Sequence, residues 1–139
     1  MLLCQISDLH IKSRGENAYR VVDTAESLRR CVAHIGSLPT APDAIVITGD
    51  LVEGGHADEY ALLRELLAPL PLPVYVIPGN HDERSAMRQA IADQPWMAQG
   101  GERIEYVIDA HPLRIVALDT VIPRRGGGQL AAESMAWLD

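Results

Sequence analysis

The sequence predicts an α/β fold with a mostly parallel sheet, because strand-like and helix-like segments alternate along its first half. Short apolar runs rich in β-branched residues are followed by longer segments whose apolar residues recur at helical spacing. Parallel neighbours need a crossover of about a dozen residues or more, which a helix usually provides. With 139 residues and 47% hydrophobic content, the chain can bury the core that such a sheet requires.

The first unit is a strand followed by a helix. Residues 2–7 form an apolar run that predicts a buried strand, and polar residues 12–17 follow as a loop. Helical spacing then predicts a helix over residues 24–37. Asp23 is its expected N-cap, since a carboxylate can accept hydrogen bonds from the free N–H groups of the first turn.

Two more strands and a helix complete a βαβαβ pattern. Residues 44–48 predict a second buried strand, which leads into the glycine-rich loop GDLVEGGH. Leucines at helical spacing predict a helix over residues 58–67, and a proline-punctuated connection leads to a third strand at residues 74–77.

The remaining chain predicts smaller elements. A short helix is expected over residues 84–91, and residues 103–108 and 113–118 are expected to pair as a hairpin joined across 109–112. A glycine loop, RRGGGQ, precedes the start of a helix at 133–138. We find no repeat or interdomain linker, so residues 1–139 are interpreted as one domain or the first part of one.

Charge and composition restrict the possible partners. The net charge of -7 argues against gripping a nucleic-acid duplex, which requires a clustered basic surface. Cys4 and Cys31 lack ligand-like spacing and are expected to be buried free thiols. Residues 66–80 are uncharged but contain four prolines, which forbid a membrane-spanning helix, and the N-terminus enters a strand without a signal segment. We therefore expect a soluble cytoplasmic protein without a membrane partner.

The chemistry-bearing residues follow the three predicted strands. Asp8 and His10 come after the first strand, Asp50 after the second, and Asn80 and His81 after the third. Because the carboxyl ends of parallel strands form the ligand crevice, these residues are expected to converge. Asp8 and His10 are two apart in what we expect to be extended backbone, which would put both side chains on one side to chelate an ion.

The residue types at this edge suit a pair of metal ions. Asp50 has two oxygens and could bridge ions spaced roughly 3.5–4 Å apart, while Asn80 would offer an amide oxygen to the second ion. Imidazole, carboxylate and amide suit Mn, Fe, Zn or Co better than a soft metal such as Cu(I). Gly49 and Gly79 would permit sharp turns and close approach of the backbone to a ligand.

Three strings of residues carry a family resemblance: D-L-H at residues 8–10, G-D at 49–50 and G-N-H-D at 79–82. Together they resemble the metallophosphoesterase (calcineurin-like) superfamily. The segments ISDLHIKSRGE, DLVEGG and VYVIPGNHD are most similar to the bacterial glycerophosphodiesterase and class III cyclic-nucleotide phosphodiesterase branch. The resemblance implies a layered α/β/β/α sandwich, of which this chain would supply the N-terminal portion and be incomplete at its C-terminus.

The resemblance also implies roles for the residues. Asp8 and His10 would bind the first metal ion, Asp50 would bridge, Asn80 would bind the second ion, and His81 would contact the substrate phosphate as acid or orienter. The implied activity is dinuclear-metal-dependent hydrolysis of small phosphodiesters by in-line attack of an activated water, with glycerophosphodiesters as the leading substrate. We also expect a homo-oligomer.

One departure from the family pattern concerns histidines. The family carries a lone histidine and a G-H-x-H string in its second half, and this sequence has neither. The remaining histidines, His34, His56 and His111, are expected to be surface or loop residues. We therefore expect a segment of a longer protein, and a chain that alone would be a poor catalyst or inactive.

Several alternatives stay open. Cyclic nucleotides are the second substrate class, and a non-catalytic binding module, a nuclease and a phosphoprotein phosphatase are competing functions. Asp82 would either orient His81 or cap the following helix. Glu53 is expected to face solvent. Arg14 is expected to be a solvated side chain, although it could reach a phosphate or a neighbouring subunit.

Overall fold

Three parallel strands form the centre of the structure: β1 (Leu3–Ile6), β2 (Ala44–Thr48) and β3 (Val74–Ile77), in the order β1-β2-β3. This computed structural model describes residues 1–99 and 101–139. β2 lies between the other two strands, and its Ile45 is opposite both Cys4 and Val74. Because β2 has a neighbour on each side, its residues Ala44, Ile45 and Ile47 are fully buried.

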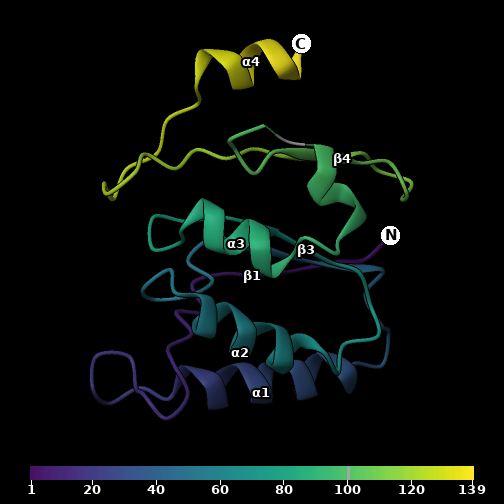
Figure 1. Ribbon diagram of the computed structural model, residues 1–139. Helices are drawn as coiled ribbons and strands as arrows, with labels where there is room; N and C mark the ends of the chain where they lie inside the picture. Colours follow the sequence, from purple (N-terminus) through teal and green to yellow (C-terminus); the bar gives the residue numbers. More distant parts are fainter. Residues whose placement is uncertain (100) are drawn as a thin grey trace.

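The layers follow the order helix, sheet, sheet, helix (Figure 1). Helices α1 (Thr24–Gly36) and α2 (Ala57–Leu67) cover one face of the parallel sheet, and α3 (Arg84–Ala90) packs against α2. On the other side, a short 3₁₀ helix η1 (Pro95–Gln99) leads to the antiparallel pair β4 (Tyr106–Ile108) and β5 (Ile115–Ala117). Helix α4 (Ala132–Leu138) is outermost. The α/β/β/α order expected from the sequence is confirmed.

Side chains join these layers. Tyr106 in β4 is buried and its hydroxyl donates a hydrogen bond of 2.8 Å to the carbonyl of Val76 in β3. Trp96 packs against the Tyr106 ring with 4.2 Å between ring centroids. These contacts hold the two sheets together at β3, so the connection after β3 has a fixed position.

The helix bounds agree with the prediction to within one residue, but β4 and β5 are shorter than predicted, at 106–108 against 103–108 and at 115–117 against 113–118. Two predictions of burial are also corrected. β2 and β3 have the predicted ends, and Asp23 caps α1 by accepting a hydrogen bond of 2.8 Å from the backbone N–H of Glu26. The prediction that β1 is buried is wrong, because Leu3 is 45% exposed. β1 and β3 are both edge strands that pair only with β2, but β3 is also covered by Tyr106 and Trp96. Cys4 and Cys31 are free thiols, but they are partly exposed and not buried.

Among the described residues, the helices are too short or too polar for any of them to cross a bilayer.

Candidate metal centre

The five predicted site residues lie at the carboxyl edge of the parallel sheet, in the loops after β1, β2 and β3. Ligand atoms of Asp8, His10 and Asp50 all lie within 4.8 Å of one another. The backbone N–H of His81 donates a hydrogen bond of 3.0 Å to Asp50 Oδ1. Asn80 and Asp50 line the same cavity of about 240 Å³. The structure therefore brings the whole predicted set together.

The loop after β1 stays attached to the loop after β2 beyond the strands themselves. The backbone N–H of Asp8 donates to the carbonyl of Gly49 at 3.2 Å, and that of His10 donates to the carbonyl of Asp50 at 2.9 Å. A parallel bridge between Ile11 and Val52 continues this pairing. These hydrogen bonds fix the position of Asp8 and His10 relative to Asp50.

The backbone at the candidate ligands is left-handed. The φ angles are 56° at Asp8, 44° at His10 and 48° at Asp50. The expectation of extended backbone from Asp8 to His10 is therefore wrong, and the two side chains converge from left-handed backbone. Left-handed conformations are uncommon for residues with a Cβ, cost free energy and cluster at functional sites.

Two glycines let the loops after β2 and β3 touch. Gly49 has a φ of 87°, and a Cβ added to it would lie 3.1 Å from the Cα of Gly79. A Cβ added to Gly79 would come within 3.0 Å of the backbone nitrogen, Oδ1 and Cγ of Asp50. The two loops approach each other closely at these glycines, and this contact sets the position of Asp50.

Asp82 is a structural anchor beneath the site. Its carboxylate accepts hydrogen bonds from the backbone N–H of Leu51 at 3.1 Å, from the N–H of Gly79 at 2.8 Å and from the hydroxyl of Tyr60 at 2.9 Å. Burial raises the pKa of Asp82 in spite of these donors. Helix α3 is capped by Glu83 instead, so Asp82 is not the cap, and it holds two site loops together.

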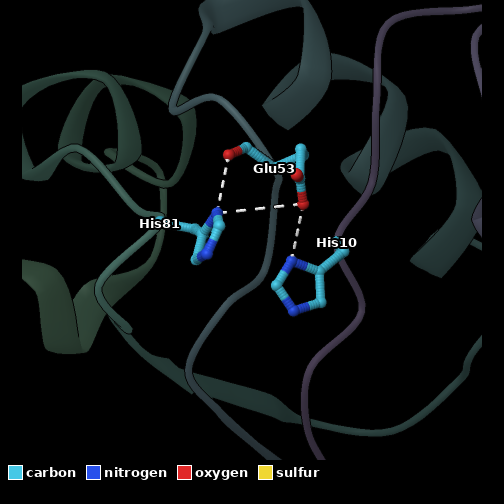
Figure 2. A group of neighbouring side chains, drawn as sticks. All are labelled: His10, Glu53 and His81. Atoms are coloured by element: carbon cyan, nitrogen blue, oxygen red, sulfur yellow. Dashed lines mark hydrogen bonds and ion pairs between the residues drawn. The ribbon is translucent and has the colours of Figure 1, made fainter. Parts of the chain in front are cut away.

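Glu53 belongs to the site, and the expectation that it faces solvent is wrong. Its Oε2 lies 2.8 Å from Nδ1 of His10, and its backbone carbonyl lies 2.9 Å from Nδ1 of His81 (Figure 2). The only sequence signal is its position, three residues after Asp50. The decisive contact is a hydrogen bond of 3.0 Å from the Glu53 N–H to the carbonyl of Ile11, which depends on the register between two loops.

The two site histidines face each other. Their ring centroids are 4.8 Å apart with an interplanar angle of 85°, and Nε2 of His10 lies 3.8 Å from Asp50 Oδ2. The pKa of His81 is raised, chiefly because the Glu53 carbonyl accepts a hydrogen bond from its ring. Burial opposes this rise, and the negative charges of Asp50, Glu53 and Asp82 add to it.

The other charged and imidazole side chains considered in the sequence lie elsewhere. His56 is the N-cap residue of α2, and Nε2 of His111 lies 3.0 Å from the hydroxyl of Tyr75. His34 is exposed in the last turn of α1, and Arg14 pairs with Glu65 at the surface. Within residues 1–99 and 101–139, these four side chains belong to no candidate metal-binding group.

The donor set fits a divalent ion. Two atoms that each lie about 2.1 Å from one ion are at most about 4.2 Å apart, and His10 Nε2 and Asp50 Oδ2 satisfy this limit at 3.8 Å. Mixed imidazole and carboxylate donors suit transition-metal ions.

Comparisons with known proteins show what this chain is similar to. A family model described as "Calcineurin-like phosphoesterase" matches residues 1–129. The "Probable glycerophosphodiester phosphodiesterase GpdQ" of Arcobacter nitrofigilis is 37% identical over 139 residues, covering 100% of this chain and 50% of the relative. The "3',5'-cyclic adenosine monophosphate phosphodiesterase CpdA" of Pseudomonas aeruginosa is 33% identical over 135 residues, covering 97% of this chain and 47% of the relative. The chain therefore spans about half the length of the curated relatives it matches.

Proposed function

Because the chain belongs to the calcineurin-like phosphoesterase family, we propose that the protein containing it is a metal-dependent phosphodiesterase acting on small phosphodiesters. The observation that carries the proposal is the convergence of Asp8, His10 and Asp50, whose ligand atoms lie within 4.8 Å of one another. The names of the relatives support diester cleavage. Glycerophosphodiesters are the leading substrate class, because the relative at 37% identity carries that name.

Calcineurin-like phosphoesterases use divalent metal ions, and the chain supplies donors for them. Asp8 and His10 would hold the first ion, Asp50 would be shared, and Asn80 would supply an amide oxygen to the second. Mn, Fe, Zn and Co all suit these donors. When bound, such ions lower the pKa of water and neutralise the charge of the phosphate.

His81 would contact the phosphate through the ring nitrogen that Glu53 does not engage. Its Nδ1 is occupied by the Glu53 carbonyl at 2.9 Å, which leaves Nε2 for the substrate. A protonated Nε2 would donate a hydrogen bond to an anionic oxygen. His81 therefore orients the phosphate or supplies a proton to the leaving oxygen.

A second candidate is hydrolysis of 3',5'-cyclic nucleotides, which is favoured by the cyclic-nucleotide phosphodiesterases among the relatives. A non-catalytic binding module is less well supported, because such a module has no need to retain both Asp50 and Asn80. A homo-oligomer stays a prediction.

The test uses the full-length protein loaded with Mn or Co. We expect faster cleavage of a chromogenic bis-aryl phosphodiester than of the matching aryl monoester, and loss of both activities after chelation. A preference for the monoester would refute the diesterase assignment. The kcat/KM values for a glycerophosphodiester and for 3',5'-cyclic AMP then decide the substrate class, and a higher value for the cyclic nucleotide would overturn the leading choice.

A further inference from the structure

We propose that Glu53 is a positioning residue that keeps the proton of His10 on Nδ1 and thereby leaves Nε2 free as a metal donor. The inference rests on the proposed metal-dependent function. It concerns a residue outside the predicted ligand set, whose side chain meets His10 in a partly buried position (Figure 2).

The first step is the hydrogen bond itself. An ionised carboxylate can only accept, so at 2.8 Å the Nδ1 of His10 must be the donor. In a neutral imidazole the other nitrogen then carries the lone pair. That nitrogen, Nε2, lies on the Asp50 side at 3.8 Å from Oδ2. The tautomer selected by Glu53 is therefore the one that can donate into the Asp8, His10 and Asp50 group.

The second step separates the side chain of Glu53 from its backbone. The Glu53 carbonyl can only accept, so His81 also carries its proton on Nδ1. This second contact does not need the Glu53 side chain, whose Oε2 lies farther from the same nitrogen, at 3.8 Å. A substitution at position 53 should therefore change the tautomer of His10 and leave that of His81 unchanged, which provides an internal control within one molecule.

The third step concerns direct ligation. Atoms of His10, Glu53 and His81 lie within 4.8 Å of one another and could hold an ion themselves. However, the Nδ1 atoms of both histidines already donate protons to Glu53. An ion there would displace two existing hydrogen bonds, whereas an ion on the Asp50 side uses the free Nε2 of His10. The geometry therefore favours Glu53 as an orienting partner.

The hydrogen bond between His10 and Glu53 is largely shielded from water. The side chains of His10 and Glu53 are 16% and 23% exposed, so water competes weakly for the hydrogen bond. An unrestrained imidazole favours the proton on Nε2, which would have to leave before that nitrogen could bind an ion. Outer partners of metal-bound histidines change metal affinity by about 10–100-fold.

Three variants of the full-length protein test the inference. Glu53→Ala removes the acceptor, and Glu53→Gln retains an oxygen acceptor of similar size without the charge. Glu65→Gln is the matched control, because Glu65 is an exposed glutamate that pairs with Arg14 at the surface. The tautomers are measured on metal-free protein with ¹⁵N-labelled histidine by long-range proton–nitrogen NMR at a pH of about 8.5, above the ordinary His pKa of about 6.5. Mn affinity and stoichiometry are measured by titration calorimetry.

We expect the wild type and Glu65→Gln to carry the His10 proton on Nδ1. In Glu53→Ala the proton moves to Nε2, the His81 tautomer stays, and Mn affinity falls about 10–100-fold with the number of ions at saturation unchanged. Glu53→Gln should retain the Nδ1 proton and most of the affinity. If Glu53→Ala does not fold, a wild-type His10 proton on Nε2 would still overturn the inference.

The inference is overturned if wild-type His10 carries its proton on Nε2, or if Glu53→Ala leaves the tautomer unchanged. The loss of one bound ion per chain at saturation in Glu53→Ala would make Glu53 a ligand and would also overturn it. If the tautomer responds as expected but the wild type hydrolyses no phosphodiester, the proposed function fails and the role of Glu53 stands.

Discussion

Replacing Gly79 with alanine should disable the site without unfolding the protein. The added Cβ would come within 3.0 Å of three atoms of Asp50, including its backbone nitrogen and the carboxylate atoms Oδ1 and Cγ. Relieving this overlap requires a shift of about 1 Å, and a misplacement of that size costs about 10²-fold in activity. Overpacking of this kind destabilises by about 1–3 kcal/mol.

The assay compares Gly79→Ala with Gly36→Ala in the full-length protein. Gly36 ends α1, and a Cβ added there has no neighbour within 4 Å, so this control should keep both metal binding and stability. Mn affinity is measured by calorimetry, kcat/KM with a chromogenic diester, and stability by urea unfolding. Wild-type metal affinity and kcat/KM in Gly79→Ala would refute the argument that contact between the two glycine turns positions Asp50.

Three further substitutions test other parts of the structure. Asp119→Asn should cost about 3–5 kcal/mol, because Asp119 is fully buried and accepts two hydrogen bonds, at 2.7 and 2.8 Å, from Arg84. Burial would raise the pKa of Asp119, but Arg84 and backbone donors outweigh burial and lower that pKa. The stabilisation should therefore be present above about pH 4 and be lost as the pH falls through the lowered pKa. An Asn variant as stable as the wild type at neutral pH would contradict this expectation. Asp50→Ala should bind fewer than two ions per chain by elemental analysis, and two retained ions would exclude Asp50 as a shared ligand. Tyr60→Phe should cost about 1–3 kcal/mol in urea unfolding, since its buried hydroxyl donates to Asp82, and an unchanged midpoint would show that this hydrogen bond is dispensable.

The central strands could be predicted because their local signals agree. Residues 44–48 and 74–77 are apolar, rich in β-branched side chains and bounded by proline or glycine, and both occupy positions in the sheet where such residues are stable. Placing Asp50 and Asn80 directly after these strands required only the rule for parallel sheets. β1 has the same kind of local sequence, but local sequence does not reveal which edge strand is covered by another layer, and only β3 is covered by Tyr106 and Trp96.

The features that the sequence did not predict depend on the backbone conformation at His10 and on how the loops after β1 and β2 pair. The left-handed φ of 44° at His10 contradicts the extended conformation that its neighbours suggest, because hydrogen bonds to the loop after β2 hold the turn. The sequence shows only that Glu53 lies near the second loop, and it predicts a solvent-facing side chain there. Its contact with His10 exists only when the two loops pair in one register, which neither segment specifies by itself.

Under the proposed metal-dependent function, the left-handed backbone at Asp8, His10 and Asp50 would link metal binding to the folded arrangement of the site loops. An unfolded chain does not retain three unfavourable backbone conformations, so the ion should bind the folded molecule much more tightly than the unfolded one. Free ion at a hundred times its dissociation constant would then raise the free energy of unfolding by about 2.7 kcal/mol. Chelation should correspondingly lower the melting temperature. The lifetime of the folded protein would then depend on the supply of the ion.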